Sequence, residues 1–323
     1  MAKVKIFIDP AHSSWILGGL VREVSTLESN FFESPTYISN FKSRFFFRSF
    51  MRICRAIIQG GPILFSSLTP LENFYKFFRL KQNEIILIYT HQDGAFSKLQ
   101  KKILFKVDLI FVFSAHDKTR LENMGLSGRI VKIMGAINPL LFSRPVLTGR
   151  TIVYVGTRVK RKNPKLFLEF AKSHPNLFFR ILGKGWKKND LWDDLKKIPN
   201  IEYREINGPI RTEDLDYCSH FLMLSDLEGG PMTLIETVAA GLIPVSTKTG
   251  ISSEFLSEVG YTKQLIDSPK NFTEIESKLQ NRYNDSDITY AIKIAKSYSI
   301  LRLSRIFKLE IESLLNNFEV NKK

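Results

Sequence analysis

The sequence predicts an α/β fold made of two Rossmann-like domains, each built on a parallel sheet. Short apolar runs of strand length alternate with longer helix-like segments along the chain, which is typical of repeated βαβ units. The length of 323 residues suits two domains of ordinary size, and 44% hydrophobic residues can fill two cores. The alternation loses its periodicity through the segment SRPVLTGR and then restarts on TIVYVG.

Ten apolar runs have the composition of buried strands, and crossover helices between them would be right-handed. These runs are residues 4–8, 62–65, 85–89, 109–113, 130–133, 152–155, 178–182, 201–204, 221–224 and 243–246. Two series of five strands predict one domain over residues 1–147 and a second over 148–323. Residues 286–318 carry apolar side chains at helical spacing, and we expect the final helix to pack back on the first domain.

The formal net charge is +15 and it is unevenly distributed. Residues 1–150 contain 21 basic and 10 acidic side chains, whereas residues 151–323 contain 26 and 22. This excess favours polyanionic partners, whether nucleic acid, an anionic membrane surface or phosphorylated ligands. Charge alone does not separate these classes.

Cysteine content and hydropathy indicate the cellular compartment of the protein. Cys54 and Cys218 are too few for a disulfide framework or a four-cysteine zinc site, and we expect reduced cytosolic thiols. No apolar run is long enough to span a bilayer, and the chain opens on a strand pattern rather than a signal peptide. We therefore expect a soluble or peripheral cytoplasmic protein.

The most informative stretch is SDLEGGPMTLIETVAAGLIPVST, residues 225–247. It follows an apolar strand and leads into a helix whose natural end is Gly241. Gly229 and Gly230 allow a ligand to approach the backbone closely, and Pro231 suits a first helical turn. The unpaired N–H groups and positive dipole end of that helix predict a phosphate site.

Glu228 and Glu236 flank this turn with seven residues between them. Two carboxylates beside a phosphate site are electrostatically unfavourable unless they bind hydroxyl groups, which a sugar and a ribose supply at the two ends of a diphosphate. The alternative is one solvated glutamate and one on a helix face.

This stretch resembles the E-x7-E signature of retaining GT-B glycosyltransferases, in particular glycosyltransferase family 4, and AAGLIPVST resembles the A-x-G-x-P-V continuation. The resemblance implies two Rossmann-like domains whose parallel sheets face a central cleft. It implies that Glu236 binds the nucleotide ribose and that Glu228 contacts the donor sugar near the reacting centre. It also implies that the backbone at Gly229, Gly230, Pro231 and Met232 contacts the sugar or the diphosphate.

A second element, YVGTRVKRKNPKLFLEFAK at residues 154–172, joins a strand to a basic loop and a helix that begins near Asn163-Pro164. It resembles the G-R-x-x-x-x-K segment of the same family, whose cations hold the donor diphosphate. Lys162 takes the lysine position, Thr157 stands in place of the arginine, and Arg158 follows one residue late. Arg161 and Lys160 are alternative cations. The alternative is a solvated basic loop or a nucleic-acid patch.

Further glycines follow strands in the second half of the chain. Gly183 in ILGKGW matches a family G-x-G with Gly185, and Gly208 in INGPI stands where the family has a glycine near the base. Each match is weak alone, since glycine after a strand is common.

In the first half, Gly18 and Gly19 open a helix after the first strand and resemble the glycine pair that lies near the donor phosphate and sugar. His91 follows the strand over residues 85–89, at the edge where open α/β sheets bind ligands, and resembles the histidine that contacts the donor sugar. His12 is a second candidate. The alternatives are a simple turn and structural histidines.

The segment FKSRFFFRSFMRICRAIIQ, residues 41–59, places Arg48, Arg52 and Arg55 at helical spacing beside apolar residues. One hypothesis is docking to an anionic membrane surface, and the alternative is a core-packing helix with a solvated arginine face.

These motifs favour a glycosyltransferase, and the family resemblance implies that it retains the anomeric configuration. We expect it to be metal-independent and to need no cofactor, because no Asp-x-Asp pair or His/Cys cluster lies in the motif segments 154–172 and 225–247. We expect a nucleotide diphosphate sugar donor, a UDP-sugar first, and a glycan or lipid-linked acceptor in bacterial surface polysaccharide or glycolipid synthesis. The enzyme would then lie in the cytoplasm or peripherally on the inner face of the plasma membrane, with no nucleic-acid partner. The alternatives are a basic nucleic-acid-binding protein and a non-catalytic sugar-nucleotide-binding protein.

Overall fold

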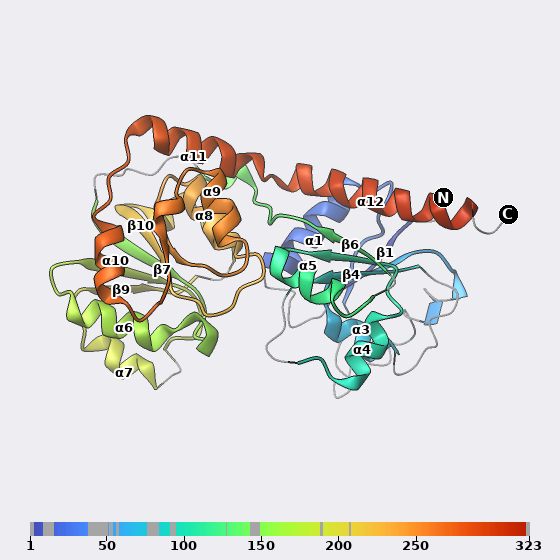
Figure 1. The fold of residues 1–323 in the computed structure, drawn as a ribbon, viewed down its shortest axis with the longest axis horizontal. Helices are drawn as coiled ribbons and strands as arrows, with labels where there is room; N and C mark the ends of the chain where they lie inside the picture. The colour runs from blue at the N-terminus through green and yellow to red at the C-terminus, as the bar shows by residue number, and fades with distance from the viewer. Residues whose placement is uncertain are drawn as a thin grey trace. The chain divides into compact units, whose positions relative to one another are not determined.

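The computed structural model describes residues 3–8, 16–37, 51, 54–55, 58–75, 84–90, 95–126, 128–142, 149–187, 190–206 and 208–320. The chain forms two compact units, each with its own sheet (Figure 1). Unit 1 comprises Met1–Ala136 and Ile300–Lys323, and unit 2 comprises Ile137–Ser299. The chain thus passes into unit 2 ahead of the boundary predicted at 147/148, and its final helix belongs to unit 1.

Unit 1 contains a six-stranded sheet in the order β2-β1-β3-β4-β5-β6, and every pairing is parallel. Its strands are β1 (Lys5–Ile8), β2 (Thr36–Tyr37), β3 (Ile63–Phe65), β4 (Ile85–Tyr89), β5 (Leu109–Val112) and β6 (Arg129–Lys132). Its helices are α1 (Ile16–Leu27), α3 (Leu68–Tyr75), α4 (Lys98–Leu104), α5 (Ala115–Glu122) and α12 (Ile300–Val320). The central strands are aliphatic and buried, as expected for a parallel sheet covered on both faces.

Helices cover both faces of the unit 1 sheet. The core on the α3 and α4 side joins Leu71, Ile103 and Leu104 to the strand side chains. Ser97 begins α4 with a capping box, because its side chain and that of Gln100 bond each other's backbone N–H. On the other side, Phe307 of α12 meets Phe111 of β5 with ring centroids 4.5 Å apart. The apolar spacing in the C-terminal segment therefore buries α12 against the first sheet.

Unit 2 contains a second parallel sheet of six strands in the order β12-β11-β10-β7-β8-β9. The strands are β7 (Thr151–Val155), β8 (Phe178–Leu182), β9 (Ile201–Arg204), β10 (Cys218–Met223), β11 (Ile243–Thr247) and β12 (Leu265–Ile266). The helices are α6 (Pro164–Ser173), α7 (Leu191–Lys196), α8 (Met232–Ala239), α9 (Ser252–Glu258), α10 (Phe272–Leu279) and α11 (Asp285–Ser297). Helices α6, α7 and α10 pack on one face, and α8, α9 and α11 lie toward the other (Figure 1).

The strand order of unit 2 reverses between β7 and β10. The chain runs outward from β7 through β8 to β9 and then returns to place β10 on the other side of β7. Such a switch point leaves a crevice outside the carboxyl ends of the two strands, where open α/β sheets bind ligands. The loops after β7 and β10 are therefore the ones to inspect for a site.

All ten predicted strands are present. The helix predicted to begin near Asn163-Pro164 is α6, the helix predicted to end at Gly241 is α8, and the helical segment predicted over 286–318 forms α11 and α12. The sequence did not predict β2 and β12, which have two residues each. Among the described residues, no helix combines the length and apolarity needed to cross a membrane.

Arg180 of β8 connects β9 with the segment that precedes β10, and its side chain is buried. Its Nη1 donates to the carbonyls of Asp214 (3.0 Å) and Asp216 (2.7 Å), and its Nε pairs with Glu202 (2.7 Å). R180M would leave both carbonyls without this donor, so we expect the free energy of unfolding to fall by about 3 kcal/mol. Urea denaturation measures this change.

The matched control is R204M. Arg204 pairs with the same Glu202 but is exposed, and we expect its loss to change the free energy of unfolding by less than about 1 kcal/mol. Equal destabilisation by R180M and R204M would contradict the stabilising role of the buried hydrogen bonds of Arg180.

Candidate functional site

Two loops meet at the switch point of unit 2: residues 156–163 after β7 and residues 224–231 after β10. The first loop turns tightly at Gly156, where a Cβ atom would lie 2.7 Å from Lys162 Cδ. It continues through a 3-10 turn at Lys160–Lys162, and Asn163 adopts a left-handed conformation immediately before α6. Pro164 then occupies the first helical position, where its missing N–H loses no bond.

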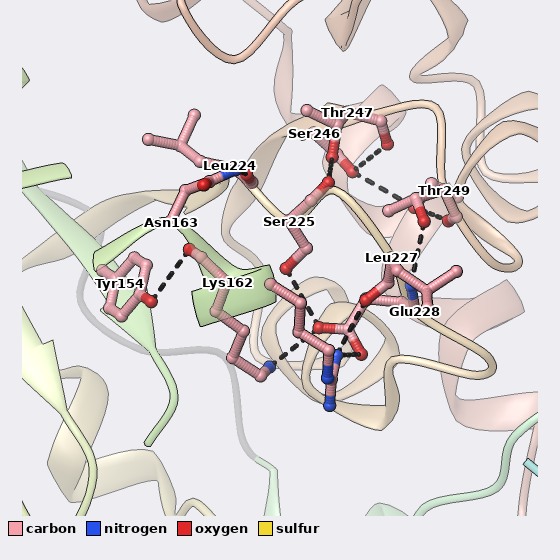
Figure 2. Close-up of polar contacts among 12 residues, drawn as sticks. Tyr154, Lys162, Asn163, Leu224, Ser225, Leu227, Glu228, Ser246, Thr247 and Thr249 are labelled. Carbon is pink, nitrogen blue, oxygen red and sulfur yellow. Dashed lines mark hydrogen bonds and ion pairs between the residues drawn. The ribbon is translucent and has the colours of Figure 1, made fainter. Parts of the chain in front are cut away.

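Glu228 is the centre of the contacts between these loops, and its side chain is buried. Its Oε2 lies 2.7 Å from Arg161 Nη1, and its Oε1 lies 3.0 Å from Lys162 Nζ. Ser225 Oγ also donates to Oε1 at 2.9 Å. Figure 2 shows the Lys162 and Ser225 side chains converging on this carboxylate. One carboxylate thus pairs with two cations from the neighbouring loop, and the cluster keeps a net positive charge.

The charge state of Glu228 follows from competing effects. Burial acts to raise the pKa of the carboxyl, but the charges of Lys162 and Arg161 and the hydrogen bonds they donate outweigh it. The pKa therefore lies below its ordinary value, and Glu228 is ionised at neutral pH.

The loop that carries Glu228 is supported from β11 as well. Thr247 Oγ1 donates to the Ser225 carbonyl at 2.6 Å, and Thr249 Oγ1 accepts from the Glu228 N–H at 2.9 Å (Figure 2). Gly250 lies so close that a Cβ atom there would sit 2.4 Å from the Gly229 carbonyl oxygen. The backbone at Gly229 is therefore held by its neighbours before any ligand binds.

Glu236 lies in α8, which begins at Met232 after Pro231 and whose eight residues are all buried. Pro231 provides no side-chain cap to the first N–H groups of this helix. Glu236 Oε2 is buried and has no hydrogen-bond partner, and burial raises the pKa of this carboxyl to about 8. A buried acceptor without a partner is rare and suggests a group that a ligand completes.

The loop after β8 packs against the loop after β7. A Cβ atom on Gly183 would lie 2.2 Å from the Gly156 carbonyl oxygen, so glycine is needed for the close approach. Trp186 Nε1 donates to the same carbonyl at 3.0 Å, and Tyr203 Oη donates to the Gly183 carbonyl at 2.9 Å. Gly208 has a φ of 136° with open space around its Cβ position. Gly183 thus shapes the crevice through backbone packing.

A comparison with protein families matches most of unit 2. Residues 143–296 match the sequence profile of the family Glycosyl transferases group 1. Over these residues the chain is similar to the group 1 glycosyl transferases. No protein in a comparison with curated sequences matches the chain.

Solved structures with the same fold span nearly the whole chain. HepE from Anabaena, in complex with UDP and glucose, superposes with a TM-score of 0.74 at 10% identity, covering 97% of this chain and 100% of that one. Sucrose-phosphate synthase from Thermosynechococcus elongatus gives 0.70 at 13% identity, with coverages of 97% and 100%. A glycosyltransferase from Rickettsia africae gives 0.69 at 12% identity, with coverages of 98% and 99%. The predicted α/β fold of GT-B type, with two Rossmann-like parallel-sheet units, is confirmed.

Several residues predicted for the site lie within unit 2 but not beside Glu228. Arg158 is exposed and pairs with Asp190 at 2.9 Å, whose side chain also caps α7. Lys160 is exposed. Of the basic residues in this loop, Lys162 and Arg161 are the pair that reaches Glu228.

Other predictions fall in unit 1 or outside the described residues. Gly18 and Gly19 lie in the first turn of α1, as the sequence predicted. His12 and His91 lie outside the described residues, and so does most of the segment 41–59. Within the described residues, no group of three or more His, Cys, Asp or Glu side chains could hold a metal ion. Metal independence stays a prediction.

Sequence reasoning missed Asn163, Ser225 and Thr249 as parts of this site. Asn163 was interpreted only as the start of a helix, and Ser225 only as the start of the signature segment. Thr249 lies just after the predicted strand at 243–246. Its position at the carboxyl end of a strand was the one sign in the sequence that it could belong to the site.

Gly250 and Gly260 both have positive φ, 58° and 81°, but only Gly250 contacts the site. G260A has open space and should cost only the backbone strain, about 1 kcal/mol. In G250A the same strain is joined by a displacement of Gly229, so we expect nucleotide affinity to weaken at least about tenfold. Calorimetric titration with UDP checks this, and equal affinities in the two variants would rule out the predicted role of Gly250.

Proposed function

We propose that this protein transfers a sugar from a nucleoside diphosphate sugar to an acceptor hydroxyl. The observation that carries the proposal is the set of charged side chains where the two loops meet at the β7/β10 switch point. There Arg161 and Lys162 meet the buried Glu228, and Glu236 offers an unpartnered buried acceptor on the following helix. Cations suit a diphosphate, and carboxylates suit sugar and ribose hydroxyls.

Each side chain then has a separate task. The diphosphate binds Lys162 and Arg161 and the backbone of Gly229, Gly230, Pro231 and Met232, while Glu236 accepts hydrogen bonds from the ribose. Glu228 binds donor-sugar hydroxyls near the reacting carbon. As the diphosphate leaves, the two cations and the amino-terminal end of α8 stabilise its growing negative charge. Arg161, rather than Arg158, is the second cation in this proposal, because Arg158 is engaged with Asp190.

A UDP-sugar is the first donor to test. HepE has been solved with UDP, with UDP-glucose, and with UDP and glucose. We extend this donor class to the present chain as a proposal, together with roles near the donor for Gly18, Gly19, Gly183, Gly208 and His91.

We further propose that the acceptor is a glycan or a lipid-linked sugar, that transfer retains the anomeric configuration, and that no metal is required. A net charge of +15 supports residence beside an anionic membrane on its cytoplasmic face, with synthesis of a bacterial surface polysaccharide or glycolipid as the setting.

The test measures the melting temperature against UDP, GDP, ADP, CMP and their sugar conjugates, with magnesium and with EDTA. A rise with one nucleoside diphosphate in EDTA supports the site, because a ligand that binds only the folded state stabilises it. NMR of the anomeric proton in the product of the matching donor tests retention. No shift at millimolar nucleotide, combined with salt-sensitive binding of RNA or DNA, would instead favour a nucleic-acid-binding protein.

A further inference from the structure

Asn163 has an unusual backbone for a residue with a side chain. Its φ and ψ are 52° and 50°, in the left-handed region, at the junction between the 3-10 turn and α6. Among the described residues, Tyr217 is the other non-glycine residue with positive φ. Left-handed backbone is unfavourable for most residues with a side chain, and asparagine is among those that tolerate it best. Such strain persists where neighbouring contacts hold it in place.

The contacts of Asn163 run to the loop that carries Glu228. Its Nδ2 donates to the Leu224 carbonyl at 2.8 Å (Figure 2). The same Nδ2 donates to Asp226 Oδ1 at 2.7 Å. In return, the Asp226 N–H donates to the Arg161 carbonyl at 2.7 Å. Asn163 and Asp226 therefore join the loops after β7 and β10 in both directions.

This connection lies directly beside the two cations of the site. Arg161 and Lys162 precede Asn163 in the chain, and the carbonyl of each is anchored, Arg161 by the Asp226 N–H and Lys162 by Tyr154 Oη at 3.0 Å. Ordering long basic side chains costs rotamer entropy. A fixed backbone beneath them leaves less to be ordered when an anion binds.

We propose that Asn163 and Asp226 are positioning residues of the donor site, which hold Arg161 and Lys162 where the diphosphate of the donor binds. This inference rests on the proposed function. Neither residue touches the donor. Both act through the two cations, and neither belongs to the motif positions that predicted the site.

Four variants separate this role from simple stabilisation. N163G keeps the left-handed backbone and removes the side chain, and D226A removes the acceptor. D226N keeps an oxygen that Asn163 Nδ2 can still reach. N200A is the matched control, because Asn200 Nδ2 also donates to backbone carbonyls, those of Ala171, His174 and Leu177, away from the loops after β7 and β10.

Calorimetric titration with UDP is the first measurement. We expect the Kd of N163G to rise about tenfold and that of D226A about fivefold, with D226N and N200A within about twofold of wild type. N200A should nevertheless melt at a lower temperature than wild type. The proposal is overturned if N163G binds UDP as tightly as wild type, or if N200A loses as much affinity.

Amide hydrogen exchange tests the connection between the loops without requiring nucleotide binding. In N163G the Asp226 amide should exchange at least about tenfold faster than in wild type, and in N200A it should not. If wild type binds no nucleoside diphosphate but this difference is present, the proposed function fails while the connection between the loops stands. If wild type binds UDP and the exchange rates are equal, the positioning role fails while the function stands.

Discussion

Replacing Glu228 with glutamine is expected to lower the rate of sugar transfer by about 10²–10³-fold without weakening UDP binding. The carboxylate binds the donor sugar in the proposed mechanism, so its charge matters most as the sugar separates from the diphosphate. In the structure the same carboxylate holds Arg161 Nη1 at 2.7 Å and Lys162 Nζ at 3.0 Å. E228Q frees both cations for the diphosphate, so we expect the affinity for UDP to stay equal or increase.

E228Q is also expected to be less stable than wild type, because it loses the same ion pairs. Arg161 and Lys162 are only 21% and 15% exposed, so removing their counter-charge leaves two poorly solvated cations side by side. Breaking a buried pair by removing one partner costs roughly 3–5 kcal/mol, and the partial exposure of these cations sets the expected loss at about 3 kcal/mol. UDP should restore much of it, and thus raise the melting temperature more in E228Q than in wild type.

Glu202 provides the control for Glu228. Its carboxylate also pairs with two basic groups, Arg180 at 2.7 Å and Arg204 at 2.5 Å, but it lies on β9 and is 46% exposed. E202Q should leave turnover and UDP affinity unchanged. Steady-state kinetics and calorimetry compare the two variants, and an E228Q enzyme that loses turnover and UDP affinity in equal proportion would contradict the assigned role.

The strands could be predicted from the sequence because buried parallel strands are continuous apolar runs of recognisable length. The two missed strands, β2 and β12, have two residues each, too few for a pattern. Their places depend on backbone pairing with β1 and β11, which is a tertiary property.

The sequence predicted that two distant motifs share one donor site, but not which of their side chains meet. Glu228 and Lys162 are 66 positions apart, and their contact depends on β10 returning to lie beside β7. The choice between Arg158 and Arg161 depends on the direction of a 3-10 turn and on the left-handed Asn163, neither of which the residue types specify. Motif spacing therefore located the loops, and the sheet topology decided which side chains meet.

Replacing Glu236 with glutamine is expected to weaken UDP binding about 30-fold at pH 9 and only about threefold at pH 7. Hydrogen bonds to a charged acceptor contribute roughly 1.5–3 kcal/mol, more than those to an amide. Burial raises the pKa of Glu236 to about 8. Before UDP binds, this carboxyl is therefore largely protonated at pH 7 and ionised at pH 9. If the ribose binds the ionised form, wild type releases a proton at pH 7 on binding, and about tenfold of its advantage over E236Q is lost there.

E236Q is expected to weaken UDP binding, but without nucleotide it is expected to raise the stability of the protein. The folded-state pKa of Glu236, about 8, lies above the ordinary value of 4.5, so its contribution to stability is complete below pH 4.5 and is lost as the pH rises toward 8. Unliganded E236Q, which carries no ionisable group at this position, should therefore melt above wild type at pH 8, with the difference shrinking toward pH 5. A residue that lowers stability in the empty protein and raises affinity for a ligand is a binding residue.

Calorimetry of UDP binding at pH 7 in buffers of different ionisation enthalpy measures the released proton directly. Wild type should release one that E236Q does not, and comparison of the two variants cancels the titration of UDP itself. T237V, the adjacent change in α8, removes a buried hydroxyl that bonds only the helix backbone and should leave both the affinity and the proton release as in wild type. If the ratio of wild-type to E236Q affinities stays constant between pH 7 and 9, the ionised Glu236 carboxylate does not bind the ribose. Burial in α8 would then be the only role of this residue.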